Sequence, residues 1–492
     1  MTVDVNLLAT LPVLIPLATA VLVLLLDAAL PGRRVAHLYL TGTGLLGGAI
    51  AAAPGLLAVS GDRASAFCLP TGACLYAADR LASTLQFCAL LGALVVLVLS
   101  WADWSRACAT DRAPVVAALL LGATAGTVAI PAAGDLGTLL VSLELATVPT
   151  VALVALTDPR WSSPRRADAV DGAVALLTTS LVSFGLLALG AALWVVATGS
   201  ALLTMPTTQR PALLLLASVF VLCGLAFKVS AVPFHAWTPL TYVTAPLPIT
   251  AYLATVSKVA ALGGLVVLIR ALGTVDNTTL LAVALLAALS MTIGNIVALV
   301  QEDAVRLLAW STVAQAGWVL LPLASLSSRA AHAAASYLIV YVVATLLAFV
   351  VVIALAHLTG STSLERHRGA MRTHPLLALA LGLALLTLAG LPPAIAGLIA
   401  KVVALRPVTG DGTWWLAIVA ALNVALGIAV YVRWIARLLG RPASVQRRQD
   451  RPVDAGSSPV PPARHTPISS WVLVAVLAAL LVVGSITPLG VI

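Results

Sequence analysis

The segment PALLLLASVFVLCGLAFKVSAVPFHAW, residues 211–237, contains the features that decide the fold of this chain. Its apolar part is about 20 residues long, which is enough to cross roughly 30 Å of hydrocarbon as an α-helix. Lys228 lies inside the apolar part, and Pro233 follows it closely. Because proline removes a helical hydrogen bond, the segment predicts a membrane-spanning helix that is kinked or broken beside a buried charge.

The same apolar character extends over the whole chain. Of 492 residues, 61% are hydrophobic and 9% are charged, whereas soluble domains carry about 25% charged residues. Backbone groups in lipid must be bonded internally, and the apolar runs lack the alternation of β-barrel strands, so they predict helices. The fold class is therefore all-α, a polytopic membrane bundle of about 14 transmembrane helices, predicted at residues 7–27, 35–53, 81–101, 113–131, 134–156, 169–198, 211–232, 244–270, 276–300, 303–325, 330–358, 375–402, 413–437 and 469–490.

Arginines in the connections indicate the orientation of the bundle. Arginine-rich and arginine-poor connections alternate, and the rich ones hold Arg33, Arg34, Arg106, Arg112, Arg160, Arg165, Arg166, Arg366, Arg368, Arg372, Arg441, Arg447, Arg448, Arg451 and Arg464. The positive-inside rule places this set in the cytoplasm and therefore predicts both termini on the outer face. The net charge of +9 is explained by these connections, so it does not indicate a nucleic-acid partner.

Two cysteines share a predicted outer connection. Cys68 and Cys74 are close enough in sequence to form a disulfide there, and the spacing alone leaves open whether they do. No cysteine pair has the spacing of a metal site.

All three lysines of the chain, Lys228, Lys258 and Lys401, lie within apolar segments. Placing a lysine near the centre of a membrane helix costs about 2.5–3.5 kcal/mol on insertion scales. A desolvated lysine can exchange a proton, whereas arginine stays charged. The three lysines therefore predict proton handling. For Lys401 an alternative is a side chain that extends to the outer interface.

Glu144 is the only glutamate deep inside an apolar segment. It is the predicted ionic partner of one of the lysines, because such a pair at about 4 Å and an effective dielectric of 20 is worth about 4 kcal/mol. The pair would take part in proton exchange. The alternative is a static salt bridge that locks two helices together.

Prolines adjoin two of the three lysines, since Pro392 and Pro393 precede Lys401 as Pro233 follows Lys228. Broken helices at corresponding positions of two halves indicate inverted repeats with ion sites at the breaks. The predicted divisions are N-terminal helices 1–112, a first half 113–270, a second half 276–437, a polar cytoplasmic linker 438–468 and a last helix 469–492.

The stretch FKVSAVPFHAWTPLTYVTAPLPITAYLATVSKVA, residues 227–260, resembles the central signature of the antiporter-like subunits of respiratory complex I, in particular the subunit N family. Similar matches are GNIVALVQEDAVRLLAWSTVAQAGW (294–318), YLIVYVVATLLAF (337–349) and LAGLPPAIAGLIAK (388–401). The resemblance implies a proton-translocating, non-redox subunit of an NADH-quinone oxidoreductase in a bacterial cell membrane. It implies that Glu144, Lys228, Lys258 and Lys401 form the proton path.

The chain lacks a Gly-rich phosphate loop and an iron–sulfur cysteine set. We therefore expect no cofactor in this chain, and the resemblance implies that quinone, FMN and iron–sulfur clusters belong to partner subunits. Other membrane-arm subunits and the lipid bilayer are the expected partners, and the chain is not expected to act as a monomer.

Some positions depart from the family pattern. The usual sixth-helix lysine corresponds to Ala175, with Asp171 at the position of the acid, and the usual tenth-helix histidine corresponds to Gln315. Two alternatives therefore stay open beside proton translocation: a subunit of a cation/proton antiporter, and a divergent structural subunit without transport. The sequence specifies neither the quinone nor the number of protons moved.

Overall fold

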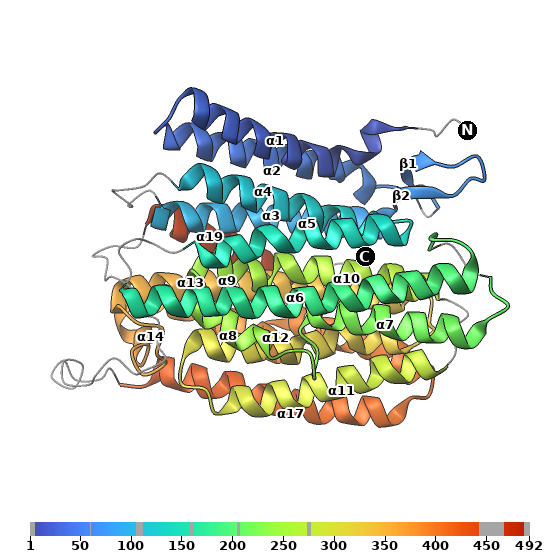
Figure 1. Cartoon of the computed structure of the whole chain (residues 1–492). Coiled ribbons are helices and arrows are strands. Elements are labelled where there is room, and N and C mark those ends of the chain that lie inside the picture. Colours follow the sequence, from blue (N-terminus) through green and yellow to red (C-terminus); the bar gives the residue numbers. More distant parts are fainter. Residues whose placement is uncertain are drawn as a thin grey trace. The chain divides into compact units, whose positions relative to one another are not determined.

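The computed structural model describes residues 5–59, 61–104, 112–156, 162–203, 207–272, 277–441 and 467–486 (Figure 1). The chain divides into two compact units, one formed by Met1–Val229 with Val256–Ala282 and the other by Ser230–Thr255 with Val283–Ile492. The residues outside these ranges include both termini, Arg106, Cys108 and Arg160. They also include most of the predicted linker, residues 442–466, with its arginines.

The first unit consists of long helices and one β-hairpin. Its elements are η1 (Leu7–Thr10), α1 (Leu11–Ala29), α2 (Arg34–Leu56), β1 (Ala64–Cys68), β2 (Cys74–Ala78), α3 (Arg80–Trp104), α4 (Ala113–Ala129), η2 (Ile130–Ala132), α5 (Leu136–Ala155), α6 (Ser163–Thr198), α7 (Pro211–Val229) and α10 (Val256–Ala271). Helices that follow one another pack together, as α1 does with α2, α4 with α5, and α6 with α7.

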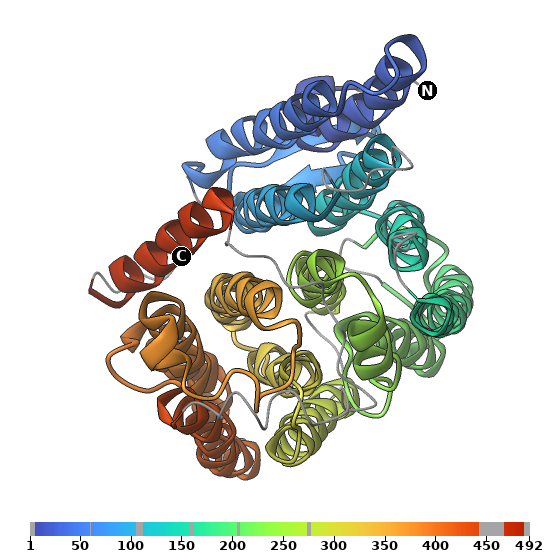
Figure 2. The same ribbon diagram turned by 90° about the vertical axis from the view of Figure 1, so that its left-hand side faces the viewer.

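All the elements named in the described part of the second unit are helices. Its elements are α8 (Trp237–Thr244), α9 (Leu247–Ala254), α11 (Asn277–Leu299, from Val283 onward), α12 (Ala304–Leu320), η3 (Leu321–Ala324), α13 (Ala330–Thr359), α14 (Ala370–Thr373), α15 (Pro375–Ala389), α16 (Ile395–Gly410), α17 (Trp414–Leu439) and α19 (Ile468–Ile486). Helix α13 packs against α15, α16 and α19, and α12 packs against α8 and α13. The green, yellow and orange helices are seen nearly end-on in Figure 2, so within each unit the axes of these helices are roughly parallel.

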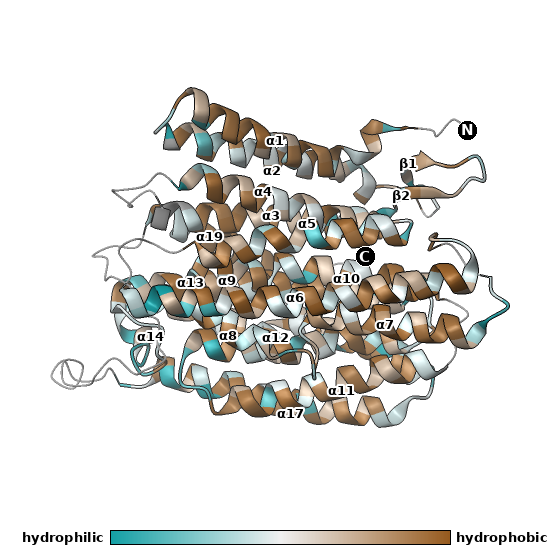
Figure 3. Ribbon diagram, in the orientation of Figure 1, coloured by the Kyte–Doolittle hydropathy of each residue, from teal (hydrophilic) through white to brown (hydrophobic). Residues whose placement is uncertain are grey.

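Thirteen helices of the described residues are long and apolar enough to cross a membrane. They coincide with the predicted spans except at residues 375–402, where the chain forms the shorter helices α15 and α16. Figure 3 shows hydrophobic residues over most of each helix and hydrophilic residues mainly at helix ends. The helical membrane bundle predicted from the sequence is confirmed, and the predicted span at residues 375–402 is one of its broken helices.

Helix α12 is almost completely enclosed. In an apolar stretch of 18 residues within the span that α12 forms with η3, Ala304–Ala324, 94% of the residues are buried, whereas the corresponding share in the α17 span is 33%. Many large apolar side chains of the peripheral helices are exposed, among them Leu181, Leu422 and Val483. Exposed apolar faces of this extent suit contact with lipid rather than water.

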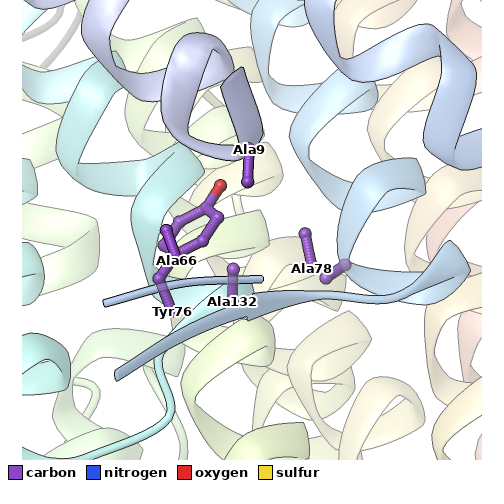
Figure 4. Close-up of a cluster of buried hydrophobic side chains, with 6 residues drawn as sticks. Ala9, Ala66, Tyr76, Ala78 and Ala132 are labelled. Carbon is purple, nitrogen blue, oxygen red and sulfur yellow. The ribbon is translucent and has the colours of Figure 1, made fainter. Parts of the chain in front are cut away.

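The connection between α2 and α3 contains a β-hairpin, where the sequence predicts only a loop. Strands β1 and β2 are antiparallel, with Cys68 opposite Cys74, and these two cysteines form a disulfide. One face of the hairpin covers a small buried cluster in which Tyr76 packs with Ala9 and Ala132 (Figure 4). Strands of five residues between long apolar helices are too short to stand out in the sequence.

Both predicted helix breaks are present, and they share their local conformation. The residue that follows α7 is Ser230 and the one that follows α15 is Gly390, and both are left-handed, with φ of 71° and 79°. Glycine adopts this conformation freely and serine does so rarely. Each break also contains a cis peptide bond, Val232–Pro233 or Pro392–Pro393.

Further local features recur in the two predicted halves. Helices α6 and α13 both end on the sequence Thr-Gly-Ser, at 198–200 and 359–361, and in both the glycine is left-handed. In both, the threonine hydroxyl donates to the serine carbonyl, at 2.8 Å and 3.0 Å. Two residues further on, each segment forms an antiparallel bridge to the aspartate that caps an earlier helix, Asp135 of α5 or Asp303 of α12.

These recurrences support two repeats. The compact units divide the chain differently, because α8 and α9 belong to the second unit and α10 to the first. The predicted boundaries 113–270 and 276–437 describe a repeat of sequence and stay a prediction.

Helices α11 and α12 approach each other at Gly294. A Cβ there would lie 2.5 Å from the backbone nitrogen of Ala314, which cannot move aside independently. Gly294→Ala should therefore destabilise the protein by about 1–3 kcal/mol, which exceeds the gain of about 1 kcal/mol that alanine has over glycine in a helix. The measurement is the midpoint of thermal denaturation of the detergent-extracted protein.

Gly382 of α15 is the matched control, since a Cβ there meets nothing within 4 Å. Gly382→Ala should leave the midpoint unchanged or raise it. Equal midpoints for the two variants would contradict the close packing of α11 on α12.

Candidate functional site

Lys228 lies in the last turn of α7, and its ammonium group binds hydroxyl groups. The Nζ atom donates to Thr147 Oγ1 of α5 at 2.7 Å and to Ser180 Oγ of α6 at 2.5 Å. The Thr147 hydroxyl in turn donates to the carbonyl of Leu143 at 2.6 Å. Lys228 is thus held between α5 and α6 by neutral ligands.

Glu144 is close to this site without touching the lysine. It precedes Thr147 by three residues on α5, so both side chains lie on one face of the helix, and its carboxylate interacts electrostatically with Lys228. Within the described residues no ion pair of 4.0 Å or less joins the two groups, and Glu144 Oε1 is buried without a hydrogen-bond partner. The predicted ionic partner is therefore a neighbour, and hydroxyl groups make the direct contacts.

Lys258, near the start of α10, binds the end of α7. Its side chain is 5% exposed, and Nζ donates to the backbone carbonyl of Lys228 at 3.2 Å. The last carbonyls of a helix have no partner within the helix and carry partial negative charge, which favours a cation. The break after α7 therefore provides an acceptor for Lys258.

Lys401 of α16 repeats this arrangement in the second unit. Its side chain is 4% exposed, and Nζ donates at 2.7 Å to the carbonyl of Ala389, the last residue of α15. The ammonium group also lies 5.0 Å from the ring centroid of Trp318. This burial argues against the alternative in which Lys401 extends to an interface.

One face of α12 carries neutral polar groups beside Lys401. Ser311, Gln315 and Trp318 follow one another at spacings of four and three residues, which places them on the same face. The Gln315 amide oxygen accepts from the Tyr337 hydroxyl of α13, and its nitrogen donates to the Tyr431 hydroxyl of α17 at 2.9 Å. The hydroxyl groups of Ser311 and Tyr431 are 2.6 Å apart.

The sixth-helix departure has a local explanation. Asp171 is exposed and Ala175 is half-buried, so Asp171 does not take the place of the missing lysine. Ser180, further along α6, supplies that helix's contact with Lys228. The other conspicuous side chain of the signature, His235, packs its ring against Trp310 at 5.1 Å.

The sequence therefore identified the charged groups and missed most of their ligands. Thr147, Ser180 and Trp318 are neutral residues of kinds common in membrane helices, so composition gives no signal for them. Helical spacing does give a signal for two of them. Thr147 is three residues from Glu144, and Trp318 is three residues from Gln315, where the chain departs from the family pattern.

Buried lysines at helix breaks within a many-spanning bundle define a membrane protein of the ion-translocating class. Residues 133–427 match the family described as NADH:quinone oxidoreductase/Mrp antiporter, transmembrane, and the chain belongs to this family.

Similar proteins agree with this assignment. A protein of Streptomyces griseus named NADH-quinone oxidoreductase subunit N 2 is 38% identical over 97% of this chain and 91% of its own length. NADH-quinone oxidoreductase subunit N of Salinispora tropica is 42% identical over 89% of this chain and 86% of its own.

Two solved structures extend the comparison. A chain of respiratory complex I from Thermus thermophilus with bound aureothin is 30% identical with a TM-score of 0.78, covering 97% of both chains. A chain of the Mrp complex from Dietzia has a TM-score of 0.84 at 21% identity, covering 98% of this chain and 95% of that chain, which shows a shared fold alone.

The contact of Ser180 with Lys228 can be tested by a double-mutant cycle. Ser180→Ala removes a ligand of a buried ammonium group and should cost about 1–3 kcal/mol of stability. In a Lys228→Met background the same change should cost almost nothing, because no ammonium group remains. Thermal denaturation midpoints of the four detergent-extracted proteins give the coupling.

Thr178→Ala is the control, since this exposed hydroxyl bonds only within α6. Equal costs of Ser180→Ala in both backgrounds would mean that the hydroxyl does not serve Lys228.

Proposed function

We propose that the chain is a proton-translocating membrane subunit of a bacterial NADH-quinone oxidoreductase, which couples quinone reduction in partner subunits to proton transfer across the membrane. The observation that carries the proposal is the set of buried lysines at helix breaks, each donating to neutral oxygen atoms. The identity of the relatives from Streptomyces griseus and Salinispora tropica supports it.

Neutral ligands suit a lysine that must gain and lose a proton. A hydroxyl or carbonyl oxygen stabilises the ammonium form by a hydrogen bond, yet it leaves no unpaired buried charge when the proton departs. A lysine clamped by a carboxylate would leave that carboxylate uncompensated. In this proposal Lys228, Lys258 and Lys401 carry the proton in turn, and Glu144 modulates Lys228 through its charge.

Lys228 and Lys258 are also linked to each other. The carbonyl that accepts from Lys258 belongs to Lys228, whose own ammonium is bound by Thr147 and Ser180. A shift of the α7 end would therefore change the surroundings of both amines together. We infer that this end is the element through which the two lysines are coupled.

The redox chemistry would then take place outside this chain. The described residues contain no cluster of three or more His, Cys, Asp or Glu side chains that could hold a metal ion. We propose that quinone, FMN and iron–sulfur clusters are bound by partner subunits, and that other membrane-arm subunits cover part of the exposed apolar faces.

The disulfide supports an orientation in a cell membrane. Disulfides form in oxidising compartments outside the cytoplasm, and the Cys68–Cys74 hairpin packs against Ala9, next to the start of α1. We propose that the hairpin and the N-terminal end of α1 face outward. This agrees with the predicted placement of the arginine-rich connections in the cytoplasm.

Two other functions compete with this proposal. The fold shared with the Mrp complex chain is compatible with a cation/proton antiporter subunit. The replacement of two expected ionisable residues by Ala175 and Gln315 is compatible with a structural subunit. Both alternatives predict that donor-driven pumping does not depend on the lysines.

Lys258→Met decides between them. Donor-driven proton uptake by inverted membrane vesicles should fall to background in this variant, because methionine fills the space without binding a proton. Native gels would confirm that the complex is assembled. Leu262→Met, a buried change one turn further along α10, is the matched control and should pump normally.

Unchanged uptake in an assembled Lys258→Met complex would leave the chain a structural subunit. Sodium-dependent proton exchange without an electron donor would instead identify an antiporter.

A further inference from the structure

The orientation of the Gln315 amide is fixed by a backbone carbonyl. Its nitrogen lies 3.4 Å from the carbonyl oxygen of Leu388, which can only accept a hydrogen bond. The nitrogen must therefore face α15, and the amide oxygen must face Tyr337, whose hydroxyl donates to it. An amide placed by such a partner has one orientation, whereas an amide between hydroxyl groups alone could take two.

Further hydrogen bonds extend from this amide. Tyr431 accepts a hydrogen bond from the Gln315 nitrogen at 2.9 Å, and its hydroxyl forms a 2.6 Å hydrogen bond with that of Ser311, in which either group can be the donor. The series of hydrogen bonds runs from Tyr337 through Gln315 and Tyr431 to Ser311. The group at the centre of this series, an amide, does not titrate.

Gln315 and Lys401 bind adjacent carbonyls at the end of α15. Gln315 donates to Leu388 and Lys401 donates to Ala389. Both carbonyls belong to the last turn of a helix that ends at a break, where carbonyl groups lack helical partners. By holding the first carbonyl, Gln315 fixes the position of the second, which is the acceptor of Lys401.

Trp318 supplies the other contact of the ammonium group. Its ring centroid lies 5.0 Å from Lys401 Nζ, within the range of a cation–π interaction. The ring is stacked on Tyr337, with centroids 5.8 Å apart and an interplanar angle of 21°. Because Gln315 binds the hydroxyl of the same tyrosine, the amide and the indole are fixed together.

Few ionisable groups face Lys401 from the elements that pack against α16. Helix α15, η3 and α19 contain none, and α13 and α17 contribute Tyr337 and Tyr431. On α16 and at its end, Arg406 and Asp411 lie further along, and Asp411 accepts a hydrogen bond from Ser325. The other charged or titratable residues of α12, α13 and α17 are Arg306, His332, Tyr341, His357, Arg433 and Arg437, of which all but Tyr341 lie toward helix ends.

We propose that Gln315 and Trp318 are positioning residues for Lys401, which stabilise its ammonium form through a fixed carbonyl and an aromatic ring and so set the pH at which it releases its proton. The inference rests on the proposed role of Lys401 in proton transfer. It also accounts for the departure at Gln315, because an amide at this position stays neutral whether or not Lys401 carries a proton.

The test is the pH profile of donor-driven proton uptake in vesicles that carry the intact complex. Trp318→Leu removes the ring, so the ammonium form loses stabilisation and Lys401 should release its proton at lower pH. The alkaline limb of the profile should move to lower pH by about one unit. Trp318→Phe retains a weaker ring interaction and should show a smaller shift, and Gln315→Leu should shift the limb in the same direction.

Trp434→Leu is the matched control, because Trp434 is a fully buried tryptophan of the same unit, on α17. Its alkaline limb should coincide with that of the wild type. An equal shift in Trp434→Leu would overturn the inference, since the effect would then belong to any loss of a buried ring. If Trp318→Leu fails to assemble, the profile of Trp318→Phe decides.

Lys401→Met distinguishes a failure of the proposed function from a failure of the positioning role. Unchanged uptake in this variant would remove Lys401 from the proton path and refute its proposed role. Loss of uptake in Lys401→Met, together with a wild-type profile for both Trp318 variants, would leave the proposed function standing and contradict the positioning role alone.

Discussion

The structure depends on a mutual compensation between broken helices and buried lysines. A helix that ends inside a membrane exposes carbonyl groups that no water is available to bind, and a lysine enclosed by apolar helices has an ammonium group in need of acceptors. In this chain the ammonium groups bind the free carbonyl groups, since Lys258 donates to the end of α7 and Lys401 donates to the end of α15. Either feature alone would be costly, and together each satisfies the other.

The two units complete this arrangement with different chemistry. In the first, the amine of Lys228 has two hydroxyl ligands and a carboxylate nearby. In the second, Lys401 has an indole ring and a glutamine that holds its acceptor. A carboxylate responds to the charge state of its neighbour, whereas a ring and an amide provide a constant environment. The first site is therefore suited to coupling between charges, and the second to a fixed affinity for the proton.

The sequence was sufficient to predict the spans, the breaks and the buried charges, because each rests on a strong local signal. Apolar runs, prolines and rare lysines can be recognised in the sequence without knowing which helices pack together. The ligands depend on which helix faces are apposed, and Ser180 or Trp318 look like ordinary packing residues until those faces are known. The sequence predicts an ion pair between Glu144 and a lysine, whereas in the structure hydroxyl groups make the direct contacts with Lys228. The hairpin escaped prediction because its strands are short.

Helix α12 has a consequence for the order in which the protein is made. Nearly all of its span is enclosed by other helices, so lipid is not the environment in which it becomes stable. Its polar face finds partners on α13, α15 and α17, all of which are synthesised after it. During translation the polar side chains of α12 therefore lack these hydrogen-bond partners until α13, α15 and α17 have been synthesised. The helix that carries Gln315 and Trp318 thus reaches its full set of contacts only after α17 has been made.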